Sequence, residues 1–137
     1  MKKIERDYRT LLKAYASLQR GVDSYKNPIL CEPKNCEMLA ISLTKRFEYC
    51  YEMTWRYYRM YINKKLEKIK TTSGKKVFYA LHGQKQITAK EKDRFLLMIK
   101  QKKKFVHQFD FALEKKLYRF IPGHYSIMKR VIKRFEP

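Results

Sequence analysis

The chain has 137 residues, a length typical of a single domain that buries its own hydrophobic core. Hydrophobic residues make up 45% of it, which excludes wholesale disorder, and no apolar run approaches the ~20 residues needed to cross a bilayer. Lys and Arg number 33 against 13 Asp and Glu, so the formal net charge is +20. That charge favours nucleic acid or another polyanion as a partner, although a biased codon pool rich in Lys, Ile and Tyr would produce the same excess.

The first residues and the cysteines bear on location and metal binding. Residues 1–6 lack the apolar stretch of a signal peptide, so we expect a cytoplasmic protein with no membrane partner. Cys31, Cys36 and Cys50 are an odd number and have no nearby His pair that would complete a zinc site. We therefore expect three reduced thiols, no metal and no cofactor.

The first third of the chain predicts two helices. Apolar residues of the first segment recur in steps of three and four, which places them on one helix face: Ile4, Tyr8, Leu11, Tyr15, Leu18 and Val22. Gly21, Pro28 and Pro33 predict the end of this helix and a loop. A longer helix is expected from about Cys36 to Leu66, with an inward stripe of Leu39, Leu43, Phe47, Cys50, Tyr51, Thr54, Tyr58, Tyr61 and Ile62.

The second half predicts shorter helices. The stretch 71–74 breaks the long helix, and a short helix over 75–82 should end at Gly83. Thr88 and Glu91 have the spacing of a capping box that opens the next helix, which carries Phe95, Leu96, Ile99, Val106 and His107. Asp110 can cap a last helical region, which Pro122-Gly123 should interrupt before it resumes at Ile127.

No segment alternates apolar and polar residues with a period of two over a useful length. Four main helices joined by short links predict an all-α fold, namely an up-and-down four-helix bundle with an additional short helix. No internal repeat or low-complexity linker divides the chain, so we expect one domain over residues 1–137.

Two segments could carry chemistry. On the long helix, Glu48, Glu52 and Trp55 share a flank because they are spaced by four and three residues. Such a flank could bind a basic loop of a partner protein. It could also hold catalytic cations in place. In so basic a chain, however, we favour the two acids as ion-pair partners of Lys or Arg.

The second segment is Lys100-Gln101-Lys102-Lys103-Lys104-Phe105-Val106-His107. On a helix, Lys100, Lys103 and His107 lie on one side and form a compact cationic spot that can bind phosphate. A row of lysines is also what a solvated helix face looks like, and a lone histidine is commonly a packed residue.

These two segments carry a resemblance to a known family. Residues 43–56, Leu-Thr-Lys-Arg-Phe-Glu-Tyr-Cys-Tyr-Glu-Met-Thr-Trp-Arg, look like the long-helix signature of the nucleotidyltransferase substrate-binding proteins, the HepT-like branch of the HEPN superfamily. The similarity runs from about Tyr8 to Phe135 and continues through Ala80, Gly83, Ile87, Phe95 and the 107–110 element. It implies a helical homodimer that pairs with a separately encoded minimal nucleotidyltransferase, often as a toxin–antitoxin couple.

In such toxins the resemblance implies a metal-independent RNase motif of Arg, a polar residue, three further residues, His, any residue and Tyr. The Arg steadies a phosphate, the His acts as acid or base, and the partner transfers AMP onto the Tyr. This chain departs from the motif, because Lys102 stands at the Arg position, Lys103 at the polar position and Phe109 at the Tyr position. Lysine loses the bidentate fork of Arg, and phenylalanine cannot accept AMP.

We therefore expect an accessory subunit rather than a self-sufficient enzyme. Glu48, Glu52 and Trp55 would bind the nucleotidyltransferase, whereas Lys102, Lys103 and His107 would form a cleft for the phosphate of RNA or a nucleotide. The alternatives are an active RNase toxin, in which His107 and Lys102 are catalytic, and an orphan basic RNA-binding bundle. A second frame, Arg119 to His124-Tyr125, fits the motif letters better. We set it aside because Pro122-Gly123 should break the helix that would align the pair.

Overall fold

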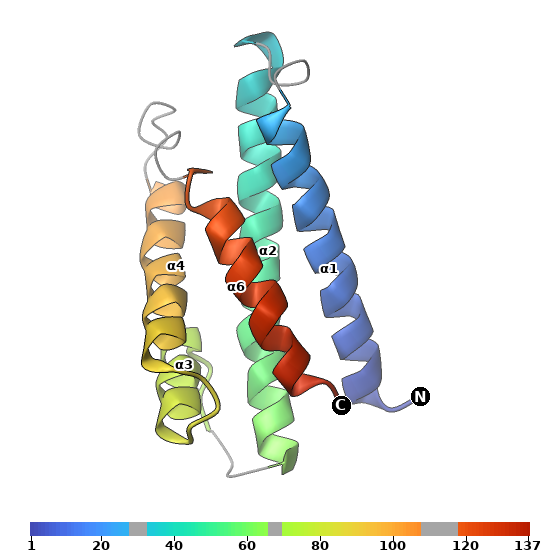
Figure 1. Ribbon diagram of the computed structural model, residues 1–137, viewed down its shortest axis with the longest axis vertical. Coiled ribbons are helices and arrows are strands. Elements are labelled where there is room, and N and C mark those ends of the chain that lie inside the picture. Colours follow the sequence, from blue (N-terminus) through green and yellow to red (C-terminus); the bar gives the residue numbers. More distant parts are fainter. Residues whose placement is uncertain (28–32, 66–69, 108–117) are drawn as a thin grey trace.

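The structure, a computed structural model, describes residues 1–27, 33–65, 70–107 and 118–137. These residues form helices α1 (Lys3–Lys26), α2 (Pro33–Lys65), α3 (Gly74–Gly83), α4 (Ala89–His107) and α6 (Ile121–Ile132), followed by the 3₁₀ turn η1 (Lys133–Phe135), and no strand occurs among them. The four long helices alternate in direction, so the two termini lie at the same end of the molecule (Figure 1). This confirms the predicted all-α, up-and-down bundle with α3 as its additional short helix.

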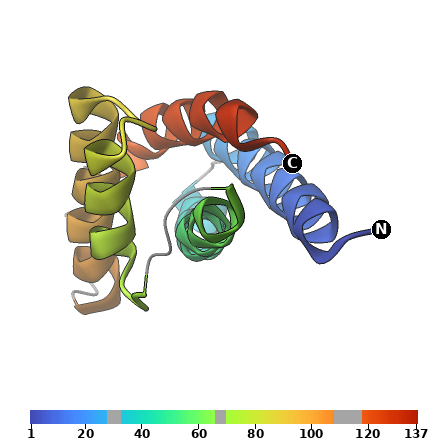
Figure 2. The same ribbon diagram turned by 90° about the horizontal axis from the view of Figure 1, so that it is seen from below.

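Helix α2 lies in the middle of the bundle. Seen from below, α1, α6 and the α3–α4 pair surround it on three sides (Figure 2). Because it is contacted on several sides, α2 buries more than one stripe of residues: Ala40, Leu43, Phe47, Cys50, Tyr51, Thr54, Trp55, Tyr57, Tyr58 and Ile62. The predicted stripe therefore captures only part of its buried surface.

The contact between α1 and α2 is apolar with a few buried polar links. The predicted face of α1 is buried, apart from the partly buried Tyr8. The Tyr15 hydroxyl lies 2.6 Å from Thr54 Oγ1, and the Thr54 hydroxyl donates to the Cys50 carbonyl at 2.6 Å. The Cys50 thiol donates to the Ala14 carbonyl at 3.2 Å. The two bonds that cross between the helices, Tyr15–Thr54 and Cys50–Ala14, fix the register of α1 on α2, because a shifted register would leave these buried groups without partners.

An aromatic cluster joins the other elements to α2. Phe78 of α3 stacks on Phe95 of α4 with ring centroids 4.3 Å apart, and Tyr58 of α2 stacks on Phe135 of η1 at 4.5 Å. The Tyr58 ring also meets both Phe78 and Phe95 edge-on. Each such pair contributes about 0.5–1.5 kcal/mol beyond its burial, so this cluster docks the short helix α3 and the C-terminal turn onto the bundle.

The capping box at the start of α4 is confirmed. Thr88 Oγ1 accepts from the Glu91 N–H at 3.1 Å, and Glu91 Oε1 accepts from the Thr88 N–H at 2.9 Å. The Glu91 carboxylate, only 3% exposed, also accepts two hydrogen bonds from Arg134, at 2.6 and 2.8 Å, and one from Arg130 at 3.3 Å. It thereby connects the start of α4 to the end of the chain.

Two expectations about proline were wrong. Pro122 and Gly123 lie in the first turn of α6, so the break falls before them, at the turn residues Arg119 and Phe120. Pro33 likewise is the first residue of α2 rather than a loop residue before it. The first-turn N–H groups of a helix have no acceptor inside the helix, so proline removes no hydrogen bond there. The helical region expected from Asp110 lies outside the described residues.

The expectation of three reduced thiols was also wrong. Cys36 is disulfide-bonded, and its partner cysteine lies outside the described residues. Cys50 is a free thiol, and burial raises its pKa to about 12, so it remains protonated as a small core residue. The cysteines therefore no longer support a reducing compartment.

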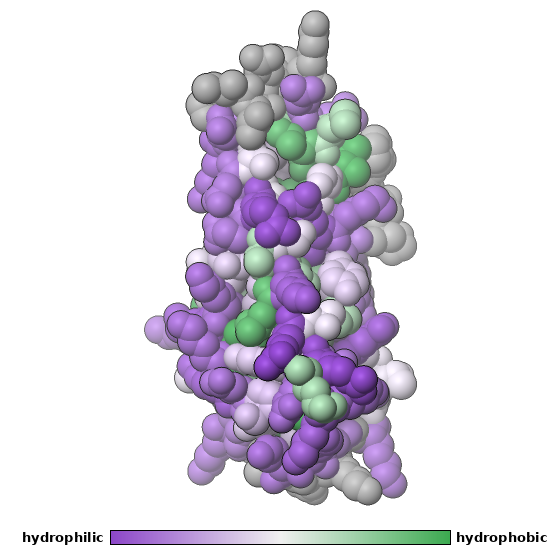
Figure 3. Space-filling view, turned by 90° about the vertical axis from the view of Figure 1, so that its right-hand side faces the viewer, coloured by the Kyte–Doolittle hydropathy of each residue, from purple (hydrophilic) through white to green (hydrophobic). Residues whose placement is uncertain are grey.

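No helix within the described residues is long and apolar enough to span a membrane. Hydrophilic residues cover most of the face shown in Figure 3, with small hydrophobic areas between them. Such a surface is expected from a chain with 33 Lys and Arg, because charged side chains remain mostly at the surface.

Candidate functional site

A groove of about 760 Å³ lies where the second half of α2 meets the start of α3 and the middle of α4. Its described lining comprises Tyr51, Glu52, Trp55, Arg56, Arg59, Thr72, Ser73, Gly74, Lys75, Ile99, Lys102 and Lys103. These residues bring five cationic side chains and one carboxylate to the same space. The groove is therefore electropositive and has an aromatic wall, a combination that suits an anionic ligand.

Glu52 is the centre of the charged groups on the α2 side of the groove. One carboxylate oxygen accepts a hydrogen bond from the Trp55 indole N–H at 3.1 Å and lies 3.7 Å from Arg56. The other oxygen pairs with the ammonium of Lys102 on α4. The interpretation of Glu52 as an ion-pair partner is therefore confirmed, and Lys102 is its partner from α4.

Trp55 forms a wall of the groove instead of projecting from the surface. Only 7% of the residue is exposed, and the guanidinium of Arg56 lies 5.5 Å from the centre of its ring. On the other side Trp55 packs against the start of α3, where a Cβ built on Gly74 would lie 2.9 Å from Trp55 Cδ1. A partner that contacted Trp55 would have to enter the groove.

Glu48, which shares the flank of Glu52 and Trp55, is not among the described residues that line the groove. Burial raises the pKa of its carboxyl, and the charges of Lys102 and Lys45 act in the opposite direction. Glu48 thus lies beside the groove, within the influence of the same lysine that pairs with Glu52.

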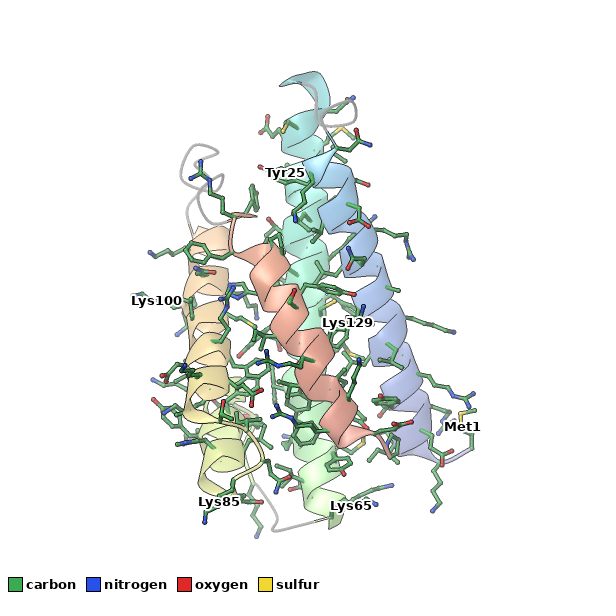
Figure 4. The ribbon with its side chains drawn as sticks, viewed as in Figure 1. Met1, Tyr25, Lys65, Lys85, Lys100 and Lys129 are labelled. Atoms are coloured by element: carbon green, nitrogen blue, oxygen red, sulfur yellow. The ribbon has the colours of Figure 1, made fainter. Side chains whose placement is uncertain are left out.

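The predicted cationic spot is divided in the structure. Lys103 lines the groove with Lys102, whereas Lys100 projects from the outer side of α4, away from the other helices (Figure 4). The α4 residues that line the groove are therefore Ile99, Lys102 and Lys103. His107 is the last residue of α4, but its side chain lies outside the described residues, as does Phe109.

The family model for nucleotidyltransferase substrate binding protein-like sequences matches residues 6–136. The chain belongs to this family. A crystal structure of a protein from Thermus thermophilus is similar in fold, with a TM-score of 0.78 over 93% of this chain and 99% of that one. At 23% identity this likeness shows the fold alone. Among curated proteins, none matches the chain.

The sequence did not predict several groove residues of this nucleotidyltransferase substrate binding protein-like chain. Arg56 and Arg59 follow Glu52 by one and two helical turns, and that spacing could have identified them. Gly74 was interpreted only as a helix breaker, yet it is the first residue of α3 and contacts the groove wall. Arg59 donates to the Thr71 carbonyl at 2.5 Å, a contact that no local pattern predicts.

A second polar cluster surrounds His124, which is fully buried. Its Nδ1 accepts from Arg94 Nε at 2.8 Å, its Nε2 lies 2.5 Å from Gln101 Oε1, and Phe47 and Phe120 stack on the ring. Burial and the charge of Arg94 lower the pKa of His124 to about 3, so the imidazole is neutral. Pro122-Gly123 lie within α6, but Arg119 lies in the turn before it, so Arg119 and His124 do not share a helix and setting aside this frame stands. Burial of a histidine bonded at both nitrogens is the stronger reason.

Proposed function

We propose that this chain is the substrate-binding subunit of a two-component nucleotidyltransferase, and that it forms a homodimer and pairs with a separately encoded minimal nucleotidyltransferase. Membership of the family supports the association with a nucleotidyltransferase. The observation that carries the proposal for this chain is the groove in which the long-helix residues Glu52 and Trp55 meet Lys102 and Lys103. The two segments that suggested function in the sequence thus line one space.

The charge of the groove supports a phosphate-bearing substrate, which is a nucleotide or RNA. Within the described lining, Glu52 opposes only part of the cationic charge, and Lys75 and Lys103 make no ion pair there. The net charge of +20 would raise the local concentration of such anions around the chain. We propose that the chain brings a phosphorylated substrate to a partner that supplies the catalytic groups.

Pairing is tested by tagged co-purification from the native cell and by co-expression with a neighbouring reading frame that has a minimal nucleotidyltransferase signature. We expect a stable complex, and light scattering of the chain alone should give the mass of a dimer. Glu48→Gln should weaken the complex, because Glu48 lies on the proposed partner-binding flank. Glu37→Gln, an exposed acid at the far end of α2, is the matched control and should not. Absence of a nucleotidyltransferase from both preparations would overturn the pairing.

Incubating the purified chain with RNA distinguishes the RNase alternative from the proposed accessory subunit. We expect intact RNA, because Lys102 is held by Glu52 and Phe109 replaces the tyrosine of the motif. Cleavage by the parent chain that disappears in His107→Ala would instead favour the toxin.

A further inference from the structure

The start of α3 is an unusual helix N-terminus. Ser73 occupies the N-cap position without a side-chain hydrogen bond, and the first turn contains no acidic residue. It contains instead Lys75 and Lys76, whose positive charges oppose the positive end of the helix dipole. The Val77 N–H donates to the Ser73 carbonyl, but the N–H groups of residues 74–76 have no acceptor inside the helix. This terminus faces the groove, because Ser73, Gly74 and Lys75 line it.

An unpartnered hydroxyl lies beside the same terminus. Tyr51 is 2% exposed, and its hydroxyl has no hydrogen-bond partner among the residues that the structure describes. It lines the groove, and its oxygen lies 3.0 Å from the position that a Cβ on Gly74 would take. A buried hydroxyl without a partner costs free energy, and an oxygen of a ligand bound at this helix N-terminus would complete its hydrogen bonding.

The turn before α3 is fixed by polar contacts. Arg59 of α2 donates to the Thr71 carbonyl at 2.5 Å, and the Ser73 N–H donates to Thr71 Oγ1 at 3.1 Å. Gly74 lets the helix start against Trp55 and Tyr51, since a Cβ there would lie only 2.9 Å from Trp55 Cδ1 and 3.0 Å from the Tyr51 hydroxyl oxygen. The N–H groups of α3 are thus held in place before any ligand arrives.

We propose that the N-terminus of α3 and the Tyr51 hydroxyl form an oxyanion site that binds the phosphate group of a small phosphorylated ligand. The first-turn N–H groups and Tyr51 donate to the phosphate oxygens, and Lys75 and Lys103 supply the positive charge. The inference rests on the proposed function in one respect, namely that the phosphate belongs to the nucleotide substrate. A groove of about 760 Å³ has the volume of a small-molecule pocket.

The Tyr51 hydroxyl is closed off from solvent, so binding requires a neighbouring side chain to move. The Lys102 ammonium lies 5.5 Å from the centre of the Tyr51 ring and is paired with Glu52. Movement of this flexible side chain would open the floor of the groove while keeping its positive charge near the anion. The ligand should therefore change the environment of the groove wall, which includes the only tryptophan of the chain.

The test uses the fluorescence of Trp55 and isothermal calorimetry on the full chain, with inorganic pyrophosphate as the probe at constant ionic strength. We expect a saturable signal that an equal ionic strength of chloride does not produce. Tyr51→Phe should weaken binding about tenfold, because it removes a donor to a charged group. It should leave the fold intact, because that hydroxyl has no hydrogen-bond partner to lose within the described parts of the chain. Tyr49→Phe, an exposed hydroxyl on the same helix, should have no effect.

Variants of two neighbouring lysines distinguish a specific phosphate site from the general attraction of anions to a basic chain. Lys75 lines the groove and Lys76 does not, although both are exposed and both lie in the first turn of α3. Lys75→Gln should weaken pyrophosphate binding severalfold more than Lys76→Gln. Equal effects of the two variants, or unchanged binding in Tyr51→Phe, would overturn the site.

A second arm identifies the source of the phosphate. ADP that competes with pyrophosphate, while adenosine does not, would support a nucleotide as the ligand. Pyrophosphate binding without ADP competition would overturn that part of the inference. Co-purification measures pairing with a nucleotidyltransferase independently of phosphate binding. A chain that pairs but binds no pyrophosphate would therefore refute this site and leave the proposed function standing.

Discussion

Glu91→Gln tests whether one buried carboxylate ties the start of α4 to the end of the chain. Burial acts to raise the pKa of Glu91, but the hydrogen bonds from Arg134, Thr88 and Arg130 lower it to about 2, against an ordinary value of 4.5. At about 1.4 kcal/mol for each tenfold change in acidity, the fall of the pKa from 4.5 to about 2 gives an upper figure of roughly 3 kcal/mol. Because both arginines are well exposed, screening lowers this figure, and we expect about 2 to 3 kcal/mol.

The direction of the pH dependence follows from the lowered pKa of Glu91 in the folded state. The contribution of Glu91 is fully present above about pH 4.5 and is lost as the pH falls toward 2. At pH 7, Glu91→Gln should therefore lower the melting temperature by roughly 10 °C, and the difference from the parent chain should shrink between pH 4.5 and 2. Calorimetry or circular dichroism at several pH values measures it. Asp93→Asn, an exposed acid two residues later, is the control and should change little. A difference between parent and Glu91→Gln that did not depend on pH would refute this reasoning.

Two further predictions concern buried polar groups. Burial and Arg94 lower the pKa of His124 from 6.5 to about 3, so protonation of this histidine opposes folding. The parent chain should therefore lose stability as the pH falls below about 6.5. His124→Gln should make the free energy of unfolding less dependent on pH between about pH 6.5 and 4.5. Tyr57 donates to the Phe135 carbonyl at 2.5 Å, so Tyr57→Phe should cost about 1–2 kcal/mol in urea unfolding, whereas Tyr51→Phe should cost nothing measurable; equal losses would contradict the assignment of partners.

The helices could be predicted from the sequence because each buries a periodic face, and periodicity is a local property of the chain. The face of α1 and the break before α3 were both predicted in this way. The errors came from proline. The sequence pattern alone does not tell whether Pro122 lies inside a helix or in its first turn, and the structural consequence is opposite in the two cases.

The candidate site could be predicted only in part, because its residues come from three separate helices. The sequence predicted that Glu52, Trp55 and Lys102 matter, but it did not predict that Glu52 and Lys102 pair across 50 residues. Glu91 shows the same limit. Its capping role is local and was predicted, whereas its bonds to Arg134, 43 residues later, depend on how α6 and η1 dock.

The pairing of Lys102 with Glu52 changes where an anion should bind. The motif frame of the family resemblance places the phosphate at Lys102 and His107, but a phosphate there would have to displace the carboxylate of Glu52 or approach it closely. At the start of α3 the unpaired N–H groups, Tyr51 and Lys75 present donors with no competing acid in the first turn. The electrostatics of this chain therefore favour an anion on the α3 side of the groove, and the Lys75 and Lys102 sides can be distinguished by comparing charge-removing variants of the two lysines.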